Sequence, residues 1–196
     1  MRLAEWKDRN EVINIITETF HDNPGSVWVL RDRVSHKKAI RCLAKYVFTK
    51  AYMRKGAYIS DNKKGMALCY RFNRKSFSFR ETWCLIRFAI FYASLKRIKE
   101  INYREEYRKS IRPPEGNYLY WWFFGVMKGG EKAGFEIARE IIDISKNTRL
   151  PIYLETAMER NMKVYSRFGY KVFHFWEEKE KNIQFWFMKR EPEDAK

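Results

Sequence analysis

The first half of the chain changes from helical to strand-like spacing of its apolar residues. Residues 8–20 carry apolar side chains three or four positions apart, and turn-forming Pro24 and Gly25 follow. Ser35 can cap a second helix that runs to about residue 53. Shorter apolar runs at 56–60 and 65–72 predict two strands joined by a hairpin-like turn. The predicted order is therefore helix, helix, strand, strand.

The second half predicts a mixture of helices around one very apolar strand. Residues 80–110 contain no Pro or Gly and become more charged along their length, which predicts one long helix or two consecutive ones. Residues 117–127 are almost continuously apolar and aromatic, as in a central strand that is covered on both faces. Further helices are predicted at 131–146 and 159–168, and further strands at 151–156, 170–176 and 183–190.

Length and composition fit one globular domain over residues 1–196. The chain has 196 residues, of which 45% are apolar, enough for a sizeable core. The first ten residues lack the apolar centre of a signal peptide, and the apolar stretch 83–95 is shorter than the roughly 20 residues that cross a bilayer. We expect a cytoplasmic protein without membrane association. Its three cysteines lack metal-ligand spacing and are expected to be buried free thiols: Cys42, Cys69 and Cys84.

The formal charge of +16, from 40 Lys and Arg against 24 Asp and Glu, raises the question of nucleic-acid binding. The basic residues are spread through several segments, and acidic residues are interleaved with them after Glu100. A positive field also attracts phosphate-bearing cofactors. Nucleic-acid binding is therefore a minor alternative.

The most informative stretch is LPIYLETAMERNMKVYSRFGY at residues 150–170. Its Leu-Glu-Thr, Arg-Asn and following Tyr, Phe, Gly and aromatic residue resemble the acyl-CoA-binding half of the GNAT N-acetyltransferase superfamily. The resemblance implies an α/β fold whose mixed, mostly antiparallel sheet has a splayed central strand pair flanked by helices. It also implies that the helical segment at about 80–112 is an insertion in a single domain. It also implies acetyl-CoA (or CoA) as cofactor, an amine-bearing small molecule or peptide as acceptor, and a possible homodimer.

The same resemblance assigns residues to cofactor binding. The end of the central strand would pair with the pantetheine arm, and the following glycine-rich loop and helix N-terminus would hold the pyrophosphate. Against the usual pattern, Glu131 places an acid where the family has a neutral or basic residue, and Glu136 replaces a small one. The implied cofactor-binding residues are Phe124, Gly125, Val126, Lys128, Gly129, Gly130, Glu131, Lys132, Ala133, Gly134, Phe135 and Asn161.

Two residues are candidates for catalysis. The resemblance implies that Tyr165 protonates the departing CoA thiolate as a general acid; the alternative is that the residue belongs to its helix's packing face. Glu155, on the strand beside the expected cleft, is the first candidate for the general base; the alternative is a surface carboxylate. The histidines lack partners for nucleophilic catalysis, so we expect the amine to attack the thioester directly.

Two functional alternatives stay open beside the N-acetyltransferase. The acidic residues Glu131 and Glu136 are compatible with a GNAT-like domain that binds CoA or a partner without catalysis. The overall basic charge is compatible with a nucleic-acid-binding module.

Overall fold

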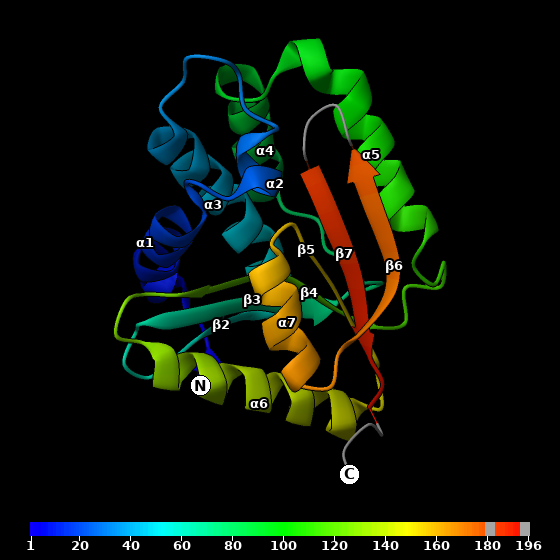
Figure 1. The fold of residues 1–196 in the computed structure, drawn as a ribbon. Helices are drawn as coiled ribbons and strands as arrows, with labels where there is room; N and C mark the ends of the chain where they lie inside the picture. Colours follow the sequence, from blue (N-terminus) through cyan, green and yellow to red (C-terminus); the bar gives the residue numbers. More distant parts are fainter. Residues whose placement is uncertain (179–182, 193–196) are drawn as a thin grey trace.

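The computed structural model describes residues 1–178 and 183–192, which form a seven-stranded sheet with helices on both faces (Figure 1). The strand order is β1-β2-β3-β4-β5-β7-β6, so the apolar strand β4 occupies the middle. Only β4 and β5 run parallel, and every other neighbouring pair is antiparallel. The predicted mixed, mostly antiparallel sheet is confirmed. The strands are β1 (Arg2–Leu3), β2 (Ala57–Ile59), β3 (Gly65–Arg71), β4 (Leu119–Val126), β5 (Ile152–Thr156), β6 (Lys171–Glu178) and β7 (Ile183–Arg190).

The helices divide between the two faces of the sheet. One core cluster joins α1 and α3 to β2, β3 and β4, whereas a second joins α6 and α7 to the opposite face (Figure 1). Ser35 caps α3 by accepting the Lys38 backbone N–H, as the sequence predicts. The helices are α1 (Arg9–Phe20), α2 (Pro24–Val27), α3 (His36–Met53), α4 (Phe79–Phe91), α5 (Ile98–Ser110), α6 (Glu131–Thr148) and α7 (Glu159–Arg167), with 3-10 turns at η1 (Trp6–Asp8) and η2 (Leu95–Arg97).

Strand β4 is buried on both faces because it contributes to both clusters. Tyr120 and Phe123 pack with the fully buried Phe48 and Ile16 of α3 and α1. Trp121 packs on the other side with the α6 residues. Burying a large apolar side chain contributes about 1.5–3 kcal/mol, so a strand that is covered twice anchors the fold.

The segment predicted to be one long helix or two consecutive ones forms two helices, α4 and α5. Between α4 and α5 the chain is held by an isolated bridge from Leu30 to Ala93, and the Arg31 guanidinium donates to the Ala93 carbonyl at 2.8 Å. Helix α4 packs on α3 through Phe88, while α5 crosses toward the far edge of the sheet, where the Tyr107 hydroxyl lies 2.6 Å from Nε2 of His174. The break places α5 over β6.

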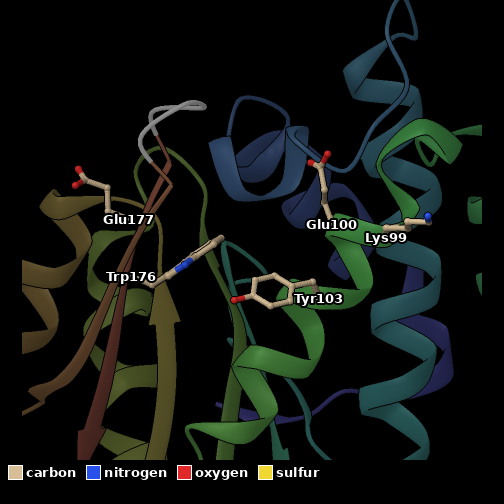
Figure 2. Close-up of a pocket in the computed structure, with 5 residues that line it drawn as sticks. All are labelled: Lys99, Glu100, Tyr103, Trp176 and Glu177. Carbon is tan, nitrogen blue, oxygen red and sulfur yellow. The ribbon is translucent and has the colours of Figure 1, made fainter.

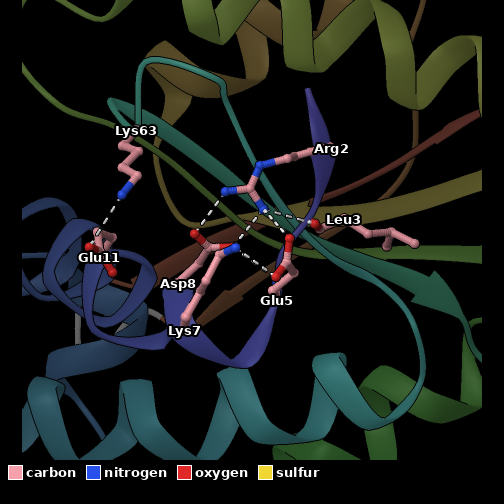
Figure 3. A network of polar contacts seen from close by, with 7 residues as sticks. All are labelled: Arg2, Leu3, Glu5, Lys7, Asp8, Glu11 and Lys63. Atoms are coloured by element: carbon pink, nitrogen blue, oxygen red, sulfur yellow. Dashed lines mark hydrogen bonds and ion pairs between the residues drawn. The ribbon is translucent and has the colours of Figure 1, made fainter.

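A buried carboxylate fastens the N-terminal strand to the first helix (Figure 3). Arg2 donates two hydrogen bonds to Asp8, at 2.6 and 2.8 Å, and the Glu5 backbone N–H donates a third at 2.8 Å. The Asp8 side chain is only 2% exposed. Its hydrogen bonds with Arg2 and Glu5 hold the pKa of Asp8 at about 2, despite the opposing effect of burial.

The structure also bears on two further expectations, the burial of the cysteines and the length of the apolar helices. Cys42, Cys69 and Cys84 are free thiols, and the first two are buried as predicted. Cys84 is only partly buried, because α4 leaves much of its surface uncovered. Among the described helices, none combines the length and the hydropathy that a bilayer crossing requires.

Candidate active site

A wedge opens between the two parallel strands at the centre of the sheet. β4 and β5 pair at three positions only, and the last pair joins Trp121 to Leu154. Beyond it, β4 continues to Val126 and β5 to Thr156 without a ladder between them. The predicted splayed strand pair is therefore confirmed. The facing backbone groups of the diverging strands can receive an extended ligand by strand addition.

A β-bulge at Trp122 accounts for the divergence. The β3–β4 register pairs Leu68 with Phe123 and Cys69 with Trp121, which leaves Trp122 as the extra residue. Trp122 and Phe123 consequently both pack into the α1/α3 core. A bulge bends its strand and increases the local twist. Because this bulge immediately follows the last residue paired with β5, it turns β4 away from β5 where the wedge begins.

The loop after β4 leads into the uncapped N-terminus of α6. Gly129 has a φ of +73°, which favours glycine, and Gly130 precedes the helix without a side-chain cap. The first N–H groups of an 18-residue helix attract anions, as the predicted phosphate site requires. The Glu131 carboxylate, however, already accepts the Gly129 N–H at 3.2 Å. An arriving phosphate would therefore compete with the chain's own anion.

Two predicted cofactor residues also have packing roles. A Cβ on Gly134 would lie 3.0 Å from Cγ2 of Val126, so glycine lets α6 approach the end of β4 closely. A Cβ on Gly125 would lie 2.6 Å from the Thr19 hydroxyl oxygen, so Gly125 makes room for α1 on the other face. Of the other predicted cofactor-binding residues, Phe124 of β4 is partly buried, Ala133 is buried, and Lys128, Lys132 and Phe135 are exposed.

Tyr165 lies on the α6/α7 face at the closed end of the wedge. Its ring packs edge-on against Trp121, with centroids 5.6 Å apart, and against Tyr170 at 5.7 Å. Burial raises the pKa of Tyr165 well above its ordinary value of 10, so the phenol keeps its proton. Asn161 lies one helical turn earlier in α7 and is partly buried. Contact with Trp121 brings Tyr165 to the point where the two strands separate.

Glu155 lies on the opposite face, just past the last β4–β5 pair. Its Oε1 accepts a hydrogen bond from the Tyr120 hydroxyl at 2.6 Å and forms an ion pair with Arg108 of α5. The side chain is 8% exposed, so the surface-carboxylate interpretation is wrong. Oε2 is buried and has no hydrogen-bond partner within the described part of the chain. This oxygen can accept a hydrogen bond from a ligand.

Sequence reasoning missed the cationic residues around Glu155. Arg108 is buried and also donates to Glu105 at 2.5 Å and to the Tyr120 hydroxyl at 2.7 Å. Lys50 of α3 lies 4.9 Å from the centroid of the Trp122 ring, and burial lowers the pKa of Lys50. The charged second half of the insertion was the only signal for Arg108, and nothing in the helical pattern of residues 36–53 distinguished Lys50.

A surface pocket of about 440 Å³ lies on the same face as Glu155, between α5 and β6. Figure 2 shows the rings of Tyr103 and Trp176 directed toward one another across it, whereas Lys99 and Glu177 point away. Trp176 follows His174 by two residues, and Phe187 of β7 pairs with both His174 and Glu155. The pocket therefore lies next to the cross-strand row formed by His174, Phe187 and Glu155.

No family model and no curated protein matches the chain. Solved structures do. The C-terminal condensation domain of Ebony, in complex with beta-alanyl-dopamine, aligns with a TM-score of 0.65 and 13% identity over 97% of this chain and 96% of that one. A histone acetyltransferase HPA2 and related acetyltransferase from Corynebacterium glutamicum gives 0.65 and 15% over 97% and 94%. Arylalkylamine N-acetyltransferase 2 from Aedes aegypti gives 0.61 and 11% over 97% of both chains.

These alignments cover nearly the whole of each chain. The chain has a GNAT-like fold. The sequence identities are only 11–15%, so the structural likeness establishes the fold alone. The activity has to be argued from the site itself.

Proposed function

We propose that this protein transfers an acetyl group from acetyl-CoA directly to a primary amine. The observation that carries the proposal is the wedge between β4 and β5. It has a protonated phenol on one face and, on the other, a buried carboxylate oxygen that has no hydrogen-bond partner among the described residues. A wedge that opens to both faces can admit the cofactor from one side and the acceptor from the other.

The α6/α7 face would hold the cofactor. Phe124, Gly125 and Val126 pair with β3 but not with β5, so the backbone groups on their β5 side can offer strand-like hydrogen bonds to an extended amide-bearing chain. The N–H groups at the start of α6, with Lys128 and Lys132 nearby, suit a pyrophosphate. Bound acetyl-CoA would supply a thioester that is activated toward nucleophiles.

The reaction needs one proton acceptor and one proton donor. Oε2 of Glu155 would accept a proton from the acceptor amine, directly or through a water, as its nitrogen bonds to the thioester carbonyl carbon. The carbon–sulfur bond breaks, and Tyr165 would donate its phenolic proton to the departing sulfur. A backbone N–H near Val126 would stabilise the charge on the carbonyl oxygen. The products are an amide and free CoA.

The acceptor face favours an amine that carries an aromatic ring. Tyr120 and Trp122 stack beside Glu155, and the pocket between Tyr103 and Trp176 opens on the same side (Figure 2). Two proteins of similar fold are compatible with this acceptor class: an arylalkylamine N-acetyltransferase, and a condensation domain that was solved in complex with beta-alanyl-dopamine. Aromatic stacking with a buried carboxylate is a suitable combination for an aryl-alkylamine.

Calorimetry with acetyl-CoA, followed by thiol release across a panel of amines, tests the proposal. We expect saturable acetyl-CoA binding and turnover that is faster with aryl-alkylamines than with alkylamines of equal length. Failure to bind acetyl-CoA or CoA would refute the proposed enzyme. Binding and turnover without a preference for aromatic amines would refute only the acceptor class.

The contact between Glu131 and Gly129 supports a second candidate, a domain that binds CoA or a partner without catalysis. An internal carboxylate in the phosphate loop reduces the advantage of the helix N-terminus for anions. CoA binding without turnover of any amine in the panel would favour this second candidate.

A further inference from the structure

Helix α4 directs a stripe of large apolar side chains away from the protein. Phe79, Trp83 and Ile90 are 81%, 65% and 56% exposed, and their spacing of four and seven residues places them on one side of the helix. Phe88, on the opposite side, is buried against α3. The helix therefore packs with its inner face and leaves an outer apolar face uncovered.

The apolar surface continues beyond the helix at both ends. Phe77 precedes α4 and is 74% exposed, while Phe91 and Leu95 at the other end are also exposed. Single exposed apolar residues are common, but a contiguous patch of this kind marks an interaction site. We define the α4 patch as Phe77, Phe79, Trp83, Ile86, Ile90, Phe91 and Leu95.

Basic residues surround the α4 patch. Residues 72–99 contain a single acid, Glu81, and it is paired with Arg54 at 2.9 Å. The same segment contains seven basic residues, of which all but Arg97 are exposed: Arg74, Lys75, Arg80, Arg87, Lys96, Arg97 and Lys99. An aromatic, apolar face with a basic border is the pattern of helices that lie in the interface of an anionic bilayer.

We propose that the α4 patch docks on the surface of a membrane that contains anionic lipids. The 13 residues of α4 span about 20 Å, against about 30 Å of hydrocarbon, so the helix lies along the interface and does not cross it. Charge decides against a second copy of the chain, because a twofold contact through this patch would bring like charges together. The proposal replaces the expectation of a protein without membrane association.

Flotation of the full chain with lipid vesicles tests the proposal. Vesicles of phosphatidylcholine with phosphatidylglycerol should carry the protein, and vesicles of phosphatidylcholine alone should carry much less. The double variant Trp83→Glu, Ile90→Glu should reduce partitioning roughly tenfold or more. Trp83→Phe should retain it. Val172→Glu, at an exposed apolar position on the far edge strand β6, is the matched control and should float like the parent.

Each alternative has its own result. Flotation that is equal for the parent and the double variant would mean adsorption by charge alone and would overturn the proposal. Absence of flotation, with a concentration-dependent dimer that the double variant abolishes in sedimentation, would assign the patch to self-association and also overturn it. Circular dichroism and thermal unfolding of each variant establish that the exposed substitutions leave the fold intact.

Discussion

Glu155 and Tyr165 lie on opposite faces of the sheet, at the point where β4 and β5 part. Glu155 accepts a hydrogen bond from the hydroxyl of Tyr120, whereas the Tyr165 ring packs against Trp121. Tyr120 and Trp121 are consecutive residues of β4 and therefore point to opposite faces. The proposed proton acceptor and the proposed proton donor thus flank one opening from its two sides, and each role can be tested separately.

Tyr165→Phe should lower kcat by about ten- to a hundredfold and change CoA affinity less than twofold, because the hydroxyl protonates the leaving thiolate without holding the cofactor. Since burial raises the pKa of Tyr165, parent activity should not decline as pH rises toward the ordinary tyrosine pKa of 10. Steady-state kinetics and calorimetry measure both effects. Equal turnover by parent and variant would leave Tyr165 as a packing residue only.

Glu155→Gln should lower kcat/KM by about a hundredfold or more, because the amide cannot accept the amine proton. The amide can still accept the Tyr120 hydroxyl, so much of the local geometry is retained. Tyr120→Phe removes the hydroxyl that receives a hydrogen bond from Arg108. This variant is the control for disturbance of the contacts around Arg108, and it should lose far less activity. If the Glu155→Gln rates recover fully with amines of low basicity, the residue is a base; if both variants lose activity in parallel with thermal stability, its role is structural.

Glu131→Gln should tighten CoA binding by about two- to fivefold, because it removes a negative charge from the first turn of α6 and weakens a competing acceptor for the Gly129 N–H. Calorimetry at low and moderate salt should show the gain shrinking as salt increases. Glu136→Gln, one turn further along the helix, serves as the comparison and should have a smaller effect. An unchanged affinity in Glu131→Gln would move the phosphate site away from this loop.

Asp8 should make stability sensitive to acid. Its carboxyl has a pKa of about 2 in the folded chain against an ordinary 3.8, so its contribution of about 2 kcal/mol is complete above about pH 4 and declines as pH falls toward 2. Asp8→Asn should lose most of this stability at neutral pH and show a flatter decline in acid. Asp143→Asn, at an exposed carboxylate, should match the parent in denaturant unfolding across the same pH range.

The sequence predicted the elements that bury one clear face. The periodic apolar positions of 8–20 and 131–146, and the continuous apolar strand 117–127, became α1, α6 and β4 with small changes at their ends. The two-residue strand β1 and the four-residue helix α2 were missed because they are too short to carry a period. The break at Ala93 depends on contact with Leu30, which is distant in sequence and leaves no local signal.

The sequence motif predicted where the candidate site lies, but not the contacts that its side chains make. Residues 150–170 placed Tyr165 and Glu155 beside a cleft. Of the two partners of Glu155, Tyr120 belongs to the predicted strand β4, but Arg108 comes from a charged helical segment that has no recognisable pattern. The bulge at Trp122 was invisible as well, because it depends on the register with β3 and not on any turn-forming residue. The contacts of Glu155 and the bend in β4 therefore depend on tertiary pairing, which local sequence patterns do not reveal.

The most direct test of the account is a crystal structure of the protein with CoA. We expect the pantetheine arm to lie between β4 and β5, with hydrogen bonds to backbone groups of residues 122–126 and its sulfur within reach of the Tyr165 hydroxyl. CoA bound elsewhere, with β4 and β5 drawn together and side chains filling the wedge, would contradict the proposed acetyltransferase.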